Sequence, residues 1–144
     1  MNKNFNYKDV PRSYLHCLNA QCGRSGDCLR FLAGLHVSKE VLSFSIINPA
    51  CVSDVEVCLY FQSNGLTRFA LGISRLYDCL PHRDAVRIRD ILFKALKRNT
   101  YYRIANRERL IRPEEQDLIR AVFEKEGNGA EVVFDEYVDR YMWC

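Results

Sequence analysis

The chain has 144 residues, of which 48% are hydrophobic and 27% are charged, and its formal net charge is +3. This composition is typical of a soluble globular protein that forms one domain or two small modules. Its apolar runs are far shorter than the roughly 18 residues of a membrane span, and its N-terminus lacks the apolar core of a secretory signal, so we expect a cytoplasmic protein without membrane contact.

The small net charge conceals a segregation of charge along the chain. Residues 1–82 carry a net charge of +2, residues 83–112 carry +7 and residues 113–144 carry −6. A basic block followed by an acidic block indicates an interaction face more than uniform solvation does.

The first half of the chain is predicted to contain one short helix and two strands. Asp27 is a favourable N-cap, and the apolar residues after it recur with helical spacing, which predicts a helix that begins there. Residues 41–47 partly alternate between apolar and polar side chains, which predicts a strand. Residues 56–62 predict a second extended segment that stops at the turn Ser-Asn-Gly. The two strands are expected to pair as a hairpin with a long connection.

The second half is predicted to be mainly helical. Residues 67–80 are compatible with a helix that Pro81 ends. Residues 83–98 form the clearest amphipathic pattern in the chain, with apolar residues on one arc and basic residues on another. A short element follows over residues 101–111, capped by Asn99 and Thr100.

A further helix is predicted to begin at Arg112-Pro113-Glu114-Glu115, because proline is tolerated in the first turn and the carboxylates complement the helix dipole. The sequence Gly-Asn-Gly ends this helix. Residues 131–134 predict a short extended segment, and residues 135–143 predict a closing helix.

These elements define an α+β chain that is mostly helical. A cysteine-rich N-terminal segment with a small β-hairpin is followed by a helical C-terminal half. We place the first module at residues 1–64 and the second at residues 65–144, and expect them to pack as one compact domain.

The most informative motif is the group of cysteines in the first half. Cys17, Cys22 and Cys28 lie within twelve residues, and Cys58 follows thirty residues later. Four thiolates bind zinc tetrahedrally, and they also hold iron–sulfur clusters. The connecting loop is small and polar, and its glycines permit tight turns, while Arg24 and Arg30 offset negative charge. We therefore predict a metal site formed by Cys17, Cys22, Cys28 and Cys58.

Several alternatives remain open at this site. Zinc is the favoured metal, an iron–sulfur cluster is the second choice, and the third is no metal at all, because free cysteine is often a buried small hydrophobe. Cys51 can replace Cys58 as the fourth ligand, and His16 or His36 can also substitute. Cys79 and Cys144 are isolated in the sequence. No P-loop, dinucleotide-binding or HExxH pattern is present, so we do not expect an enzyme.

The basic block contains a second informative stretch, Lys97 to Gly127. Tyrosines and arginines are interleaved there, which is typical chemistry for contacts to nucleic-acid phosphates. The candidate nucleic-acid-binding residues are Arg98, Tyr101, Tyr102, Arg103, Arg107 and Arg109. The alternative is that Tyr101 packs in the core while the arginines pair with the acidic C-terminal block.

Two resemblances accompany these patterns. Residues 98–127, which include YYRIANRERLIRPEE, are similar to part of a phage-repressor-type helix-turn-helix, its second half, although Arg107 stands where the turn glycine is expected. That resemblance implies that Tyr101, Tyr102, Arg103 and Arg107 face the major groove of duplex DNA. Over nearly its full length, through YKDVPRSYLHCLNAQC, SIINP and FDEYVDRY, the chain resembles an uncharacterised bacterial protein family.

The combined interpretation is a small metal-binding protein with a regulatory contact to duplex DNA. The alternative is a protein-interaction adaptor that docks an acidic partner and has buried, metal-free cysteines. A thiol enzyme is the third hypothesis.

Overall fold

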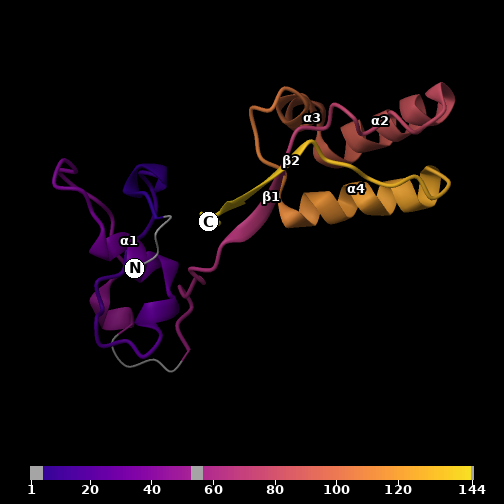
Figure 1. Cartoon of the computed structure of the whole chain (residues 1–144). Coiled ribbons are helices and arrows are strands. Elements are labelled where there is room, and N and C mark those ends of the chain that lie inside the picture. Colours follow the sequence, from indigo (N-terminus) through magenta and orange to yellow (C-terminus); the bar gives the residue numbers. More distant parts are fainter. Residues whose placement is uncertain (1–4, 53–56, 144) are drawn as a thin grey trace. The chain divides into compact units, whose positions relative to one another are not determined.

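The computed structural model describes residues 5–52 and 57–143 and shows an α+β fold (Figure 1). The described residues form four α-helices and a two-stranded antiparallel sheet, so the predicted α+β class is confirmed. The elements are α1 (Leu29–Leu35), β1 (Thr67–Leu71), α2 (His82–Leu96), α3 (Arg98–Ala105), α4 (Pro113–Glu126) and β2 (Glu136–Arg140). Three short 3-10 helices cover Tyr7–Asp9, Ser25–Asp27 and Pro49–Cys51. No helix in the described part is long and apolar enough to cross a membrane.

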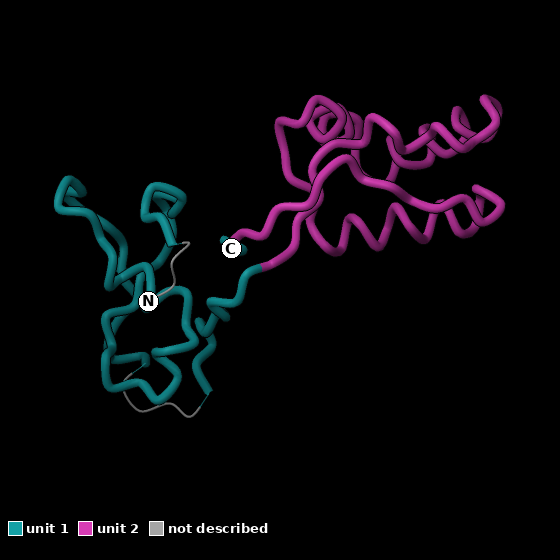
Figure 2. Tube along the Cα trace, viewed as in Figure 1, with its two compact units in different colours: residues 1–66, 141–144 teal, residues 67–140 magenta. Residues whose placement is uncertain are grey.

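The chain divides into two compact units (Figure 2). Unit 1 comprises Met1–Leu66 together with Tyr141–Cys144, and unit 2 comprises Thr67–Arg140. The chain leaves unit 1 at the start of β1 and returns to it at the end of β2. Unit 1 is therefore assembled from two separate parts of the sequence.

The sheet lies in unit 2 and differs from the prediction. β1 pairs with β2 in an antiparallel register that runs from Thr67 opposite Arg140 to Leu71 opposite Glu136. The predicted helix over residues 67–80 and the predicted closing helix over residues 135–143 are both wrong, because β1 and β2 occupy parts of these stretches and residues 74–79 form turns. The backbone groups of each strand form hydrogen bonds with a strand that is far away in the sequence. Local periodicity does not reveal such a pairing.

Gly72 ends β1 in a left-handed conformation, with φ of 83°. A Cβ atom at this position would overlap the carboxylate of Asp135. Asp135 Oδ2 accepts a hydrogen bond of 3.1 Å from the backbone N–H of Ser74, and the Asp135 N–H donates to the Gly72 carbonyl at 3.1 Å. The glycine thus permits a close turn in which Asp135 closes the end of the strand pair.

We expect Gly72→Ala to destabilise unit 2 by about 3 kcal/mol, from the left-handed backbone and from displacement of the Asp135 carboxylate. Gly129→Ala is the matched control, because Gly129 also has positive φ, of 82°, but no atom lies within 4 Å of its added Cβ. The control should cost only about 1 kcal/mol. Chemical denaturation followed by helical circular dichroism measures both values, and equal losses would contradict a specific role for Asp135.

The helices of unit 2 enclose its core. α2 ends before the single residue Lys97, whose φ is 66°, and α3 begins directly after it. The predicted helix at Pro113 is confirmed as α4, in which Glu115 accepts a hydrogen bond of 3.0 Å from the Arg112 N–H. Buried apolar side chains from all three helices, from β1 and from the connecting segments form one cluster, including Ile88, Leu92, Ile104, Ile111, Ile119 and Phe123.

Unit 1 has little regular structure. The predicted helix near Asp27 is present as α1, although it begins two residues later, with Cys28 as its N-cap. The predicted hairpin is wrong for the described residues of unit 1, which contain no strand. Residues 41–47 make only one isolated bridge, between His16 and Ile46, and the predicted second strand lies partly outside the described residues. A small cluster formed by Tyr14, Leu29, Ala33 and Tyr141 is the core of this unit.

Candidate functional site

The loop that carries the first three cysteines is folded by short-range turns. The Cys22 N–H donates to the Asn19 carbonyl at 3.4 Å, and the Ser25 N–H donates to the Cys22 carbonyl at 3.0 Å. The 3-10 helix Ser25–Asp27 then leads directly to Cys28 at the start of α1. These turns bend the chain back on itself, so the loop surrounds the space between its cysteines.

Cys17 is held against the helix that follows this loop. Its N–H donates to the carbonyl of Arg30 at 3.0 Å. Gly34 on α1 permits this approach, because a Cβ atom at that position would overlap the carbonyl oxygen of Cys17. The backbone on both sides of the loop is therefore tied to α1.

Cys17, Cys22, Cys28 and Cys58 all line one small cavity. Its volume is about 30 Å³, and apolar side chains such as Phe31, Ile47, Val52 and Phe61 complete the wall. Cys28 is buried, while Cys17, Cys22 and Cys58 are partly exposed, and all four are free thiols. Cys51 is exposed and does not line the cavity. The structure thus brings together the four cysteines that the sequence singled out.

Within the described residues, the side chains of His, Cys, Asp and Glu do not converge in groups of three or more at metal-binding distance. The donor set nevertheless suits a soft or borderline metal, since four thiols share one largely apolar cavity. Ligation would require the four thiols to turn toward a common centre.

Two arginines contact the segment that follows Cys58 and forms part of the cavity wall. Arg30 donates from Nε to the Tyr60 carbonyl at 2.9 Å and from a terminal nitrogen to the Leu15 carbonyl at 3.0 Å. The guanidinium of Arg24 lies 3.4 Å from the ring centroid of Phe61. These contacts connect the segment after Cys58 to the cysteine loop, and Arg30 itself lines the cavity.

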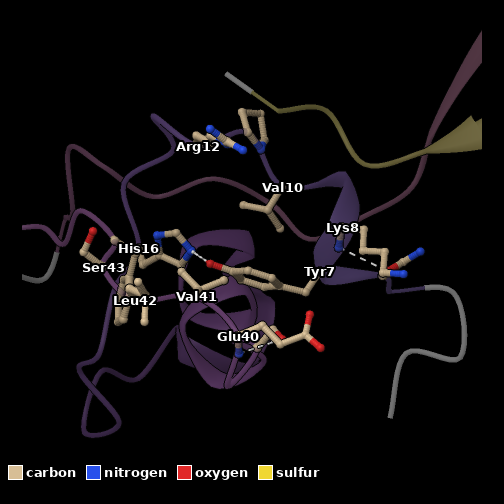
Figure 3. A pocket seen from close by; sticks show the side chains of 13 residues that line it. Tyr7, Lys8, Val10, Arg12, His16, Glu40, Val41, Leu42 and Ser43 are labelled. Atoms are coloured by element: carbon tan, nitrogen blue, oxygen red, sulfur yellow. Dashed lines mark hydrogen bonds between the residues drawn. The ribbon is translucent and has the colours of Figure 1, made fainter.

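The histidines considered as alternative ligands have other partners. The Nδ1–H of His16 donates to the Ser45 carbonyl at 3.1 Å, and the Tyr7 hydroxyl donates to its Nε2 at 2.9 Å (Figure 3). His16 is 2% exposed and lines a separate, larger cavity of about 880 Å³. The Nδ1–H of His36 donates to the Leu32 carbonyl at 2.9 Å. Neither histidine lines the cysteine cavity.

Several of the predicted nucleic-acid-binding residues have partners within unit 2. Arg107 lies 2.7 Å from Glu136 Oε1 and 3.7 Å from Asp135 Oδ2. Arg109 lies 2.8 Å from Glu115 Oε1. Burial of Asp135 opposes its ionisation, but hydrogen bonds from Ser74 and the charge of Arg107 outweigh that effect and hold the pKa of this carboxyl below its usual value. The basic and acidic blocks are therefore partly paired with each other.

The two neighbouring tyrosines have different environments. Tyr101 is 5% exposed, and its hydroxyl lies 2.7 Å from the hydroxyl of Tyr77. Burial raises the pKa of both phenols above the ordinary value of 10, so they stay neutral at physiological pH. Tyr102 is 44% exposed, and Arg98 and Arg103 are exposed as well.

Sequence reasoning missed two residues beside Tyr102. Arg89 and Phe93 on α2 line a cavity together with Tyr77, Tyr101 and Tyr102. The signal was present in their spacing, because residues four apart lie on the same face of a helix. Phe93 lies beside the main apolar stripe and was therefore not recognised as part of a second face.

Comparison with family models matches residues 1–143 to a family of unknown function (DUF6078). No curated protein and no solved structure matches the chain.

Proposed function

The chain belongs to this family of unknown function, and we propose that within it the protein is a small zinc-binding protein whose four ligands are Cys17, Cys22, Cys28 and Cys58. The single observation that supports this proposal is the shared cavity of the four thiols. Three of them come from one loop, and the fourth is brought in from a distant segment by the hydrogen bonds of Arg30. Zinc acts structurally here, as a cross-link between these segments.

The size of the cavity favours zinc over an iron–sulfur cluster. A volume of about 30 Å³ accommodates one water-sized group. A single zinc ion needs only that space between four sulfur atoms, whereas a cluster of several iron and sulfide ions would force the walls apart. The nearby guanidinium groups of Arg24 and Arg30 offset the negative charge that four thiolates give to a zinc centre.

The organisation of unit 1 supports a structural role for the ion. Its hydrophobic cluster has four buried members, its one α-helix has seven residues, and its described part contains no strand. A small unit with so little core usually depends on a disulfide or a metal for stability. The cysteines are free thiols, so a bound ion is the appropriate cross-link.

The test is the metal content of protein purified without chelators, measured by mass spectrometry. We expect about one zinc per chain, since one Cys₄ set binds one ion. Cys22→Ser should lose the metal, whereas Cys51→Ser should keep it because Cys51 lies outside the cavity. Protein that is folded, reduced and metal-free would overturn the proposal. Brown protein containing iron and sulfide would replace zinc with a cluster.

A further inference from the structure

A second face, on unit 2, combines arginines with aromatic rings. The guanidinium carbons of Arg89 and Arg98 each lie 5.9 Å from the ring centroid of Phe93. Arg98 also lies 5.7 Å from the ring of Tyr102, and the two rings are 5.6 Å apart. We call Arg89, Phe93, Arg98 and Tyr102 the aromatic–arginine cluster. It is formed by the last turns of α2 and the first turns of α3.

The arginines of this cluster differ from their neighbours in the basic block. Arg87, Arg107 and Arg109 each form an ion pair with at least one carboxylate. Within the described part of the chain, no carboxylate lies within 4 Å of the guanidinium of Arg89 or Arg98, and both contact ring faces instead. The cluster therefore retains positive charge that the acidic block does not neutralise.

The cluster borders a cavity with room for one flat ring. The cavity has a volume of about 340 Å³, and Tyr77, His82, Arg89, Phe93, Tyr101 and Tyr102 line it. Its size is at the lower end of the range for small-ligand sites. The side chains of Ala85 and Val86 complete the lining, and the hydroxyls of Tyr77 and Tyr101 lie 2.7 Å apart. An aromatic base with polar edges matches this lining.

We propose that the aromatic–arginine cluster binds single-stranded nucleic acid, with one unstacked base against Tyr102 and Phe93 and its phosphates at Arg98 and Arg89. Stacking on aromatic side chains beside a positively charged surface is the common chemistry of single-strand binding. A duplex keeps its bases stacked inside and does not offer a free ring to this cavity.

The charge around the aromatic–arginine cluster favours a nucleic-acid strand over a free nucleotide as the ligand. Further exposed basic side chains come from the same segment of the chain, namely Lys94 on α2, Lys97 between the helices and Arg103 on α3. Residues 83–112 carry a net charge of +7, and although Arg87, Arg107 and Arg109 are paired with carboxylates of the acidic block, more positive charge remains than one phosphate group needs. Successive phosphates of a strand complement such a surface. This inference concerns unit 2 and does not depend on the zinc site.

The test uses the full chain and a fluorescent oligothymidylate of about twelve nucleotides, within the size range of single-strand sites. Fluorescence anisotropy at low salt should show binding that weakens steeply as salt increases. Tyr102→Ala should reduce the affinity about tenfold or more, and Tyr102→Phe should restore it because the ring is retained. Arg98→Ala should weaken binding and lower the magnitude of the salt slope by about 0.7.

Arg107→Ala is the matched control, since this arginine belongs to the same basic block but is paired with Asp135 and Glu136. It should leave the affinity nearly unchanged. Equal losses for Arg98→Ala and Arg107→Ala would overturn the proposal in favour of general charge attraction. Tighter binding of the matched duplex, competition by thymidine monophosphate at comparable concentration, or no binding at low salt would overturn it as well.

Discussion

If unit 1 holds the zinc ion proposed above, its removal with a chelator should unfold unit 1 while the helices of unit 2 remain folded. Zinc bound by four thiolates supplies on the order of 10–16 kcal/mol of apparent binding free energy in small domains at pH 7. That contribution is comparable to or larger than the total stability of a typical domain, about 5–15 kcal/mol. Unit 1 has only a small core, so it lacks a replacement for the lost ion. Unit 2 has its own core of twelve buried residues.

Two spectroscopic signals separate the units. Trp143 is the single tryptophan of the chain, and its ring packs edge-on against Tyr14 at 5.0 Å, within unit 1. Three of the four α-helices lie in unit 2. After chelation, we expect tryptophan fluorescence to shift to that of an exposed indole while most of the helical circular dichroism persists.

Cys58→Ser should reproduce the effect of chelation, and Cys51→Ser should behave as the unaltered protein because Cys51 is exposed and outside the cavity. Unchanged fluorescence in protein from which zinc has verifiably been removed would contradict a structural role for the ion. Simultaneous loss of both signals would show instead that unit 2 also requires the metal.

Phe123→Ala should destabilise unit 2 by about 3–5 kcal/mol, because it removes a large side chain from a packed core and leaves a cavity. Phe123 is 1% exposed, and its ring lies 6.2 Å from that of Tyr77. The measurement is the denaturant midpoint followed by helical circular dichroism. Leu118→Ala is the matched control on the same helix, since Leu118 is 36% exposed. A loss below about 1 kcal/mol for Phe123→Ala would show that α4 does not anchor this core.

The parts of the fold that could be predicted from sequence are those that depend on local signals. α2 follows from apolar periodicity, and α4 follows from apolar periodicity and from Pro113 at its start. The strands could not be predicted, because the pairing of Thr67 with Arg140 joins residues far apart in the chain. Gly72 gave a partial signal, since a glycine inside a presumed helix is unfavourable.

The group of cysteines was easier to recognise from the sequence than the aromatic–arginine cluster. The small, polar residues between Cys17 and Cys28 indicated a loop folded around its thiols. Sequence could not choose between Cys51 and Cys58, because the choice depends on which one the tertiary fold exposes. On α3, Tyr101 and Tyr102 differ by about 100° around the helix axis. Tyr101 is therefore buried, whereas Tyr102 is exposed.

The insertion of unit 2 between residues 66 and 141 has a consequence for the order of folding. The final residues, Tyr141 and Trp143, must return to the aromatic core of unit 1 across the whole of residues 67–140. Closing a flexible loop of that length costs about 4 kcal/mol of chain entropy, apart from a constant. Once β1 and β2 have paired, Thr67 and Arg140 are direct neighbours, and that entropic cost has already been met within unit 2. Folding of unit 2 before unit 1 would therefore hold the two separated parts of unit 1 close together through the paired strands β1 and β2.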